Sequence, residues 1–212
     1  MRIQRNKNSN GEVQWNTKKP SKIDTNYLSI DVSKLSDKHF NYKTLAIMSL
    51  YSTPQNGHML LNRDVLFDHD NEIEQLSNLK MNTILRSIRK LAVKDDLVKQ
   101  YRDELGYMYY SIATNQCVRV NKNTLKQLIN MGDNNLIKTY LFLLSQCSKF
   151  EKKVITNQLI TQNIGLSPTS NNSMQAITNS TNKLNELGLI QKTRQTFMDN
   201  GTPKTFNKYL IL

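Results

Sequence analysis

The stretch that decides the fold is GLSPTSNNSMQAITNSTNKLNELGLI, which runs from Gly165 to Ile190. Its opening Gly-Leu-Ser-Pro is typical of a turn that ends one helix and begins the next, and Gly188 stands where a glycine commonly follows a helix. Between these turns, the residues of one helical face recur at intervals of three and four, namely Met174, Ile177, Thr181, Leu184 and Leu187. We therefore expect a helix, a turn and a second helix.

A β-hairpin is predicted to follow this second helix. Residues 191–197 and 205–212 have the composition of strands, and an Asn-Gly pair, typical of a tight hairpin turn, stands at 200–201 between them. The order helix, turn, helix, hairpin, together with the L-x-x-L-G-L-I sequence from Leu184 to Ile190, resembles the winged helix-turn-helix family. That resemblance implies DNA binding and implies no catalytic chemistry.

The same order of elements occurs twice along the chain. The segment beginning at 27 matches the segment beginning at 117, and the apolar helix beginning at 43 matches the one beginning at 138. In each copy a short strand precedes an apolar helix, a turn (52–57 in the first copy), a short extended piece, further helices and a hairpin. We predict an α+β, mainly helical fold with two tandem winged helix-turn-helix domains, at 23–114 and 115–212, related by internal duplication.

The first 22 residues are predicted to form a basic, flexible N-terminal arm. Lysine and arginine alternate there with Asn, Ser and Gly, and the apolar residues show no period. Such an arm can lie along phosphates or in a minor groove, although a simply solvated terminus is the more common case.

The candidate recognition helix of the first domain runs from Lys80 to about Lys94. Arginines on its outward face have the geometry for bidentate contacts to guanine. The tip of the hairpin that follows, at 103–106, is acidic, so we expect the helix to contribute most of the binding in this domain. The predicted DNA contacts of the first domain are Lys80, Asn82, Thr83, Arg86, Arg89, Lys90, Lys99 and Arg102.

The corresponding helix of the second domain is rich in amides and poor in charge. Asn and Gln can pair bidentately with adenine N6 and N7, which suits a site that contains A·T pairs. The predicted contacts of this helix are Asn171, Asn172, Gln175, Thr178, Asn179, Asn182 and Lys183. Phosphates beside the helix would meet the basic residues of the second hairpin, Lys192, Arg194, Lys204 and Lys208. A solvated strand edge explains any one of these lysines equally well, whereas the two helix faces taken together favour contact with DNA.

The overall charge also favours a polyanionic partner. The 212 residues contain 29 Lys and Arg against 17 Asp and Glu, a formal net charge of +12. The chain has no apolar run near 18 residues and no secretory signal pattern, so we expect no membrane association and a cytoplasmic location. Double-stranded DNA is the expected partner, with a second copy of the chain or replication and transfer proteins as further possibilities.

No enzyme class is indicated by the motifs. The chain lacks a glycine-rich phosphate loop, a G-x-S-x-G sequence and an H-E-x-x-H sequence. Cys117 and Cys147 lack the spacing of a metal site, and His69, although flanked by two aspartates, is more typical of an acidic turn. We therefore expect no catalytic residues, no metal, no cofactor and no small-molecule substrate.

Within DNA-binding proteins, the leader at 27–35 and the helix beginning at 43 resemble the start of winged-helix domains in replication initiators of low-GC plasmids and phages. Two winged helices in one short chain is also the plan of iteron-binding initiators. A transcriptional regulator, a conjugation-accessory protein and a winged-helix module that binds only proteins remain alternatives. The short linker at 114–116 predicts a fixed spacing of the two helices, and their unlike faces predict an asymmetric or directly repeated target. Dimerisation through one domain is the competing arrangement.

Overall fold

The computed structural model describes residues 26–55, 58–94, 96–147, 150–199 and 202–212, with backbone only at 197, 199, 202 and 203. It also describes the backbone of two short antiparallel strands near the N-terminus, β1 (Asn6–Lys7) and β2 (Val13–Gln14). The predicted basic arm otherwise lies outside the described residues, as does the Asn-Gly turn at 200–201. The described chain is a mixture of helices and small antiparallel sheets.

The first half of the described chain covers residues 26–113. In chain order its elements are β3 (Tyr27–Asp31), α1 (Tyr42–Leu50), β4 (Thr53–Gln55), β5 (His58–Asn62), α2 (Arg63–Asp68), α3 (Asp70–Ser77), α4 (Met81–Lys94), β6 (Val98–Arg102) and β7 (Met108–Ala113). The last two strands form the first hairpin, and the sheet has the order β4-β5-β7-β6. Helix α4 follows α3 after a three-residue turn in which Asn78 is left-handed (φ 55°).

The second half covers residues 117–212. Its elements are β8 (Cys117–Asn121), α5 (Lys122–Met131), α6 (Asn134–Gln146), β9 (Lys153–Val154), α7 (Asn157–Asn163), α8 (Asn171–Glu186), β10 (Ile190–Asp199) and β11 (Thr202–Ile211). Strands β10 and β11 form the second hairpin, and the sheet has the order β10-β11-β9. In both halves, then, the short strand before the last helices pairs with the final strand of the hairpin.

Three local expectations differ from the structure. Helix α5 was not predicted, and the corresponding stretch of the first half, 32–41, forms turns. Residues 53–55, expected within a turn, form strand β4 because they pair with β5. The strands of the second hairpin are longer than predicted, since the ladder extends to the Asp199–Thr202 pair.

Glycine ends both helices of the stretch that decides the fold. After α8, Gly188 (φ 67°) and Leu189 donate their N–H groups to Asn185 O and Leu184 O, the pair of bonds that closes a helix on a left-handed residue. After α7, Gly165 (φ 78°) and the next residue make the equivalent bonds to Gln162 O and Thr161 O. Both glycines were predicted at these positions, because helix-ending signals are local.

The two halves are joined by strands β3 and β8, which pair with each other in antiparallel register. Ser29 faces Arg119, and these are the residues that correspond when the two leaders are aligned at their spacing of 90 residues. The pairs on either side are reciprocal, since Tyr27 faces Asn121 and Asp31 faces Cys117. A local two-fold axis therefore passes through the Ser29–Arg119 pair, as in the self-complementary interface of a symmetric dimer.

Two lysines repeat this two-fold relation away from the strands. Lys43 Nζ donates to Gly132 O at 3.1 Å, and Lys138 Nζ donates to Asp37 O at 2.6 Å. The two lysines are 95 residues apart, and so are the two carbonyl groups, so each contact is the counterpart of the other. Lys138 is 1% exposed and donates a second bond to Ile164 O at 3.1 Å, at the end of α7.

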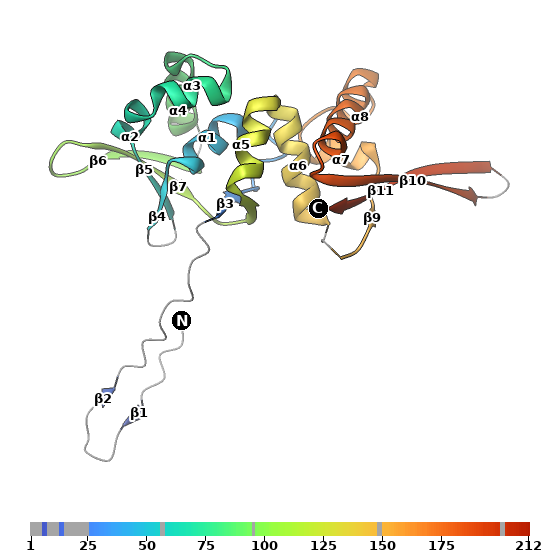
Figure 1. Ribbon diagram of the computed structural model, residues 1–212, viewed down its shortest axis with the longest axis horizontal. Coiled ribbons are helices and arrows are strands. Elements are labelled where there is room, and N and C mark those ends of the chain that lie inside the picture. Colours follow the sequence, from blue (N-terminus) through green and yellow to red (C-terminus); the bar gives the residue numbers. More distant parts are fainter. Residues whose placement is uncertain are drawn as a thin grey trace.

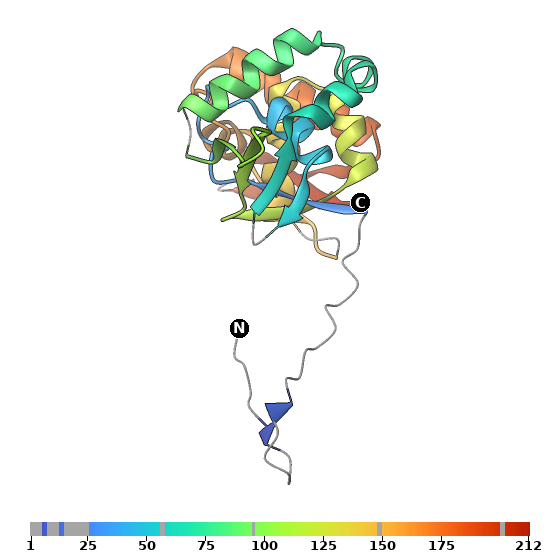
Figure 2. The same cartoon turned by 90° about the vertical axis from the view of Figure 1, so that its left-hand side faces the viewer.

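The halves share one hydrophobic core. Buried side chains of α1, such as Leu45 and Ile47, belong to the same cluster as Ile137 and Leu141 of α6. Asp31 is also buried, and its carboxylate accepts the N–H groups of Asn115 and Gln116 in the linker. In Figure 1, α4 and α8 lie on the side away from β3, and the two hairpins point outward in opposite directions; Figure 2 shows α4 across the end opposite β3.

A substitution at Gly165 tests how closely the two halves pack against each other. A Cβ atom on Gly165 would lie 2.3 Å from Ser36 O and 2.8 Å from Lys38 N, whereas a Cβ on Gly188 would meet nothing within 4 Å. Gly188→Ala should lower the free energy of unfolding by about 1–2 kcal/mol, through the left-handed conformation alone. Gly165→Ala should cost about 1–3 kcal/mol more, because the Ser36 backbone must move. Urea unfolding of the two variants measures the difference, and equal losses would contradict the close fit.

Lys138 should make stability depend on pH. Burial lowers the pKa of Lys138 from 10.5 to about 8, against the opposing effect of Asp37, which raises it. Between these two values the unfolded chain still holds a proton that the folded chain has released, so the contribution of Lys138 to the free energy of unfolding rises with pH. The difference in free energy of unfolding between the wild type and Lys138→Met should therefore be about 1–2 kcal/mol larger at pH 9.5 than at pH 7. Urea unfolding at both pH values measures this, with the exposed Lys126→Met as control; a constant difference would contradict it.

Candidate nucleic-acid interface

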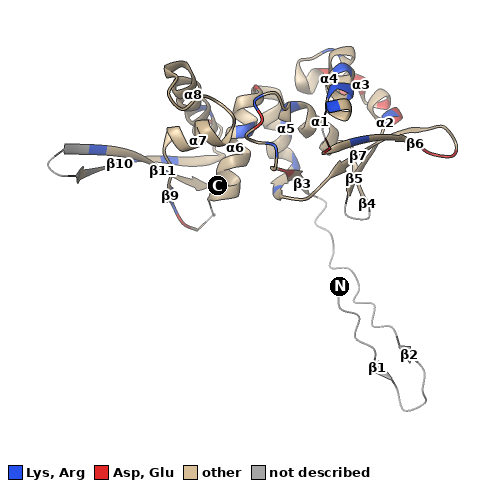
Figure 3. Ribbon diagram, turned by 180° about the vertical axis from the view of Figure 1, so that it is seen from behind, with Lys and Arg blue, Asp and Glu red and all other residues tan. Residues whose placement is uncertain are grey.

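Helix α4 buries one face and exposes a basic one. Met81, Ile84 and Ile88 pack into the core. Glu74 Oε1 accepts the N–H of Met81 at 2.7 Å and its other oxygen pairs with Lys80 at 3.0 Å, which fixes the start of the helix. All six predicted contacts on or just before this helix are exposed, namely Lys80, Asn82, Thr83, Arg86, Arg89 and Lys90. Figure 3 shows the resulting concentration of basic residues along α4.

Helix α8 exposes amides. Gln175 Nε2 donates to Asn179 Oδ1 at 2.8 Å, which holds two amide side chains together one turn apart. This pairing leaves Gln175 Oε1 as an acceptor and Asn179 Nδ2 as a donor. The exposed predicted residues of α8 are Asn171, Asn172, Gln175, Asn179 and Asn182, while Lys183 is half-buried and lies 3.9 Å from Glu186.

Thr178 was predicted to face DNA, and the structure turns it inward. Its hydroxyl donates to Met174 O at 3.0 Å and accepts from Asn157 Nδ2 at 3.0 Å, so it ties α8 to α7. Thr178 lies at the edge of the buried face of the helix, where a threonine can point either inward or outward. The sequence alone therefore does not distinguish the two orientations.

The two helices align residue by residue at a constant spacing of 93. Five of the aligned pairs are identical, namely Met81 with Met174, Ile84 with Ile177, Ser87 with Ser180, Lys90 with Lys183 and Leu91 with Leu184. On the outward face, by contrast, Arg86 corresponds to Asn179 and Arg89 to Asn182. The sequence prediction of a repeat rested on the leaders and on the apolar helices beginning at 43 and 138, whose spacings of 90 and 95 both differ from 93, so it did not include this match.

The basic residues of the second hairpin do not share one face. Residues that stand opposite each other in an antiparallel ladder project to the same side, and neighbours in a strand alternate. Lys208 faces Thr193 and Lys204 faces Phe197, which places both lysines on the side away from Lys192 and Arg194. Contact of these four residues with phosphates stays a prediction, and the register divides them between the two faces of the ribbon.

Lys192 is held by α8. Its Nζ donates to Thr181 Oγ1 at 2.8 Å and to Asn182 Oδ1 at 2.7 Å. Burial lowers the pKa of Lys192, and the nearby Arg194 lowers it further. Lys192 thus fixes the hairpin against the helix, while Arg194 is exposed on the same side of the ribbon.

The first hairpin divides its basic residues in the same way. Lys99 faces Ser111, whereas Arg102 faces Met108 on the opposite side of the ribbon. At the tip, the Asp103 carboxylate accepts the N–H groups of Leu105 and Tyr107 at 3.0 and 2.8 Å. The acidic tip predicted from sequence therefore includes one carboxylate that shapes the turn.

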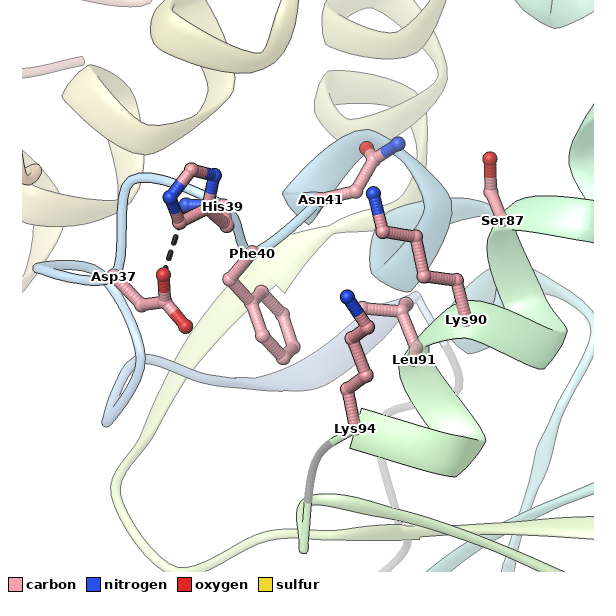
Figure 4. Close-up of a pocket in the computed structure, with 8 residues that line it drawn as sticks. All are labelled: Asp37, His39, Phe40, Asn41, Ser87, Lys90, Leu91 and Lys94. Atoms are coloured by element: carbon pink, nitrogen blue, oxygen red, sulfur yellow. Dashed lines mark hydrogen bonds between the residues drawn. The ribbon is translucent and has the colours of Figure 1, made fainter.

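A cavity adjoins each of the two helices. The larger, of about 460 Å³, lies between α4 and the turn at 37–41, and Figure 4 shows the ammonium groups of Lys90 and Lys94 directed toward that turn. A second cavity, of about 310 Å³, lies between α8 and the turn that joins α5 to α6.

The described residues include the histidine and the two cysteines singled out in the sequence. No group of three or more His, Cys, Asp or Glu residues there is arranged to hold a metal ion. His69 Nδ1 lies 3.4 Å from Glu72 Oε2, and both side chains are about half exposed. Cys117 is exposed, contrary to its apolar neighbours in the sequence, and neither it nor Cys147 forms a disulfide. Among the described helices, none has both the length and the apolar character needed to cross a bilayer.

No protein-family model matches the chain, and no curated protein matches it either.

Proposed function

We propose that the protein binds double-stranded DNA in a sequence-specific manner through two winged helix-turn-helix units related by internal duplication. The observation that carries this proposal is the pair of aligned helices, α4 and α8, exposed on one side of a molecule whose net charge is +12. Further support comes from a pairing that both halves share, in which the short strand before the last helices pairs with the final strand of the hairpin, β5 with β7 and β9 with β11. The five identities at a constant spacing of 93 support a duplication.

The two helices differ in the chemistry that they offer to bases. Arg86 and Arg89 on α4 are donors suited to the O6 and N7 acceptors of guanine. On α8, Gln175 Oε1 and Asn179 Nδ2 form an acceptor and a donor, the complement of the N6 donor and N7 acceptor of adenine. The proposed target therefore has a guanine-containing half-site under α4 and an adenine-containing half-site under α8.

The orientation of the half-sites follows from the two-fold relation. Two helices related by a two-fold axis meet a duplex in inverted orientation, as the paired helices of symmetric helix-turn-helix dimers do, about 10–10.5 bp apart. The unlike helix faces predicted an asymmetric or directly repeated target, whereas the β3–β8 register favours inverted half-sites in the present proposal. The site stays asymmetric in sequence because the helix faces differ.

For the biological role, we propose a replication initiator of a plasmid, phage or other mobile element. Support comes from the resemblance of the leader and the paired domains to such initiators. A transcriptional regulator or a conjugation-accessory protein would share the DNA-binding geometry, and footprinting on the DNA beside the gene separates them. Protection of repeats at an origin would support initiation, whereas protection confined to the promoter of the gene itself would favour a regulator.

DNA binding should depend strongly on salt. If about 6–10 phosphates are neutralised, affinity for duplex DNA should fall roughly 10³–10⁵-fold between 50 and 200 mM salt, because the displaced counterions are released less favourably. Fluorescence anisotropy across this range measures the slope. Absence of binding to any duplex at low salt would leave the protein-only interaction module as the better account.

The arginines of α4 should set guanine preference. Selection of sites from random duplexes by the wild type should return two unlike, inverted half-sites. The double variant Arg86→Asn/Arg89→Asn should lose guanine preference in one half-site, with about 5- to 150-fold lower affinity per lost bidentate contact. Arg194→Gln is the control, expected to weaken binding to all sequences similarly. An unchanged selected site in the double variant would show that α4 reads no guanine.

A further inference from the structure

The two cavities beside α4 and α8 are counterparts. The lining of the first is Asp37, His39, Phe40, Asn41, Ser87, Lys90, Leu91 and Lys94, and that of the second is Met131, Gly132, Asp133, Leu136, Asn179, Ser180 and Lys183. The turn residues 37 and 41 correspond to 132 and 136 at the spacing of 95 already seen for Lys43 and Lys138. The helix residues 87 and 90 correspond to 180 and 183 at the spacing of 93. One two-fold relation therefore connects the cavities as well as the strands and lysines.

Two residue pairs that line the cavities are identical, whereas several exposed residue pairs of α4 and α8 are unlike. Ser87 and Lys90 have identical counterparts, Ser180 and Lys183, and all four line a cavity. Arg86 and its counterpart Asn179 are unlike, and only Asn179 lines a cavity. In a duplex, the phosphates of two inverted half-sites are equivalent whatever the sequence, whereas the base edges are not. The identical serines and lysines therefore line the cavities at the positions where a ligand common to both half-sites would bind.

We propose that each cavity binds one phosphate of the DNA backbone, with Lys90 and Lys183 as the ammonium donors. The inference rests on the proposed DNA binding and adds two phosphate sites related by the two-fold axis. Both cavities lie between a helix and the turn that enters α1 or α6, where the halves contact each other. The phosphates held there belong to the backbone between the two grooves occupied by α4 and α8.

The carboxylates near the cavities are engaged in the fold. Asp37 Oδ1 accepts the N–H of His39 at 2.8 Å, and Asp133 Oδ1 accepts the N–H of Leu136 at 2.9 Å as the cap of α6. Glu186 lies 3.9 Å from Lys183 and partly offsets its charge. The first cavity has a second lysine, Lys94, near Lys90 on α4, as Figure 4 shows, so it should hold its phosphate more strongly than the second.

Neutral phosphate analogues can locate the two contacts. A methylphosphonate linkage, which removes one charge, would be placed at each position in turn along both strands of the duplex that the wild type selects. Wild-type affinity should fall most at two inner positions related by the dyad of the site. Lys90→Gln should abolish sensitivity at one of these positions, and Lys183→Gln should abolish it at the other. Each substitution should also reduce the slope of log affinity against log salt by about one.

The control is Lys152→Gln, which removes an exposed lysine before β9 and should change neither pattern. Thermal melts equal to that of the wild type would show that the variants fold. If duplex binding persists while both lysine variants keep the wild-type pattern, the phosphate sites are refuted and the DNA-binding function stands. If no duplex binds, the proposed function itself fails. Inorganic phosphate that raises the melting temperature through Lys90, without any position effect in DNA, would assign the cavity to a free anion instead.

Discussion

The pairing of β3 with β8 is the constraint on which the rest of the structure depends. Because the two leader strands correspond to each other and pair in antiparallel register about Ser29 and Arg119, the halves can face each other in only one way. The axis set by that pair brings α1 against α6, and it makes the contacts of Lys43 and Lys138 with opposing turns reciprocal. The ammonium group of Lys138 donates to Asp37 O and to Ile164 O, so it links α6 both to the turn before α1 and to the end of α7. A single chain thereby acquires the organisation of a symmetric dimer.

This organisation separates what the halves share from what distinguishes them. The identical pairs between α4 and α8 comprise core residues, such as Leu91 and Leu184, and the lysines at the cavities. Among the unlike pairs, Arg86 with Asn179 and Arg89 with Asn182 are on the outward face, whereas Ile88 with Thr181 is an unlike pair in the core. Under the proposed duplication and DNA binding, divergence on the outward face would let the halves read two different half-sites while both meet a backbone of the same shape. The fixed linker, held by the Asp31 carboxylate, keeps both faces at one spacing.

Local features of the fold could be predicted from the sequence, and relations between distant strands could not. The extents of α4 and α8, the glycine ends at Gly165 and Gly188 and the two hairpins follow from periodicity and turn chemistry, which depend on near neighbours. Helix α5 was missed although Leu125, Leu128 and Ile129 have helical spacing, because its counterpart in the first half forms turns. The division of Lys192 and Lys204 between two faces depends on ladder register, and the inward turn of Thr178 depends on Asn157 in another helix. For the same reason, the lysines that join the halves gave no signal in the sequence.

The central claim is that one chain presents two two-fold-related helices to one duplex. The mass of the complex by native mass spectrometry, measured beside a hydroxyl-radical footprint on the same selected duplex, tests it most directly. The account predicts one chain per site, with protection on one face of the DNA over two adjacent major grooves about one helical turn apart. Two chains on a palindromic footprint, each contributing a single helix, would contradict it and would make one half of each chain a dimerisation domain.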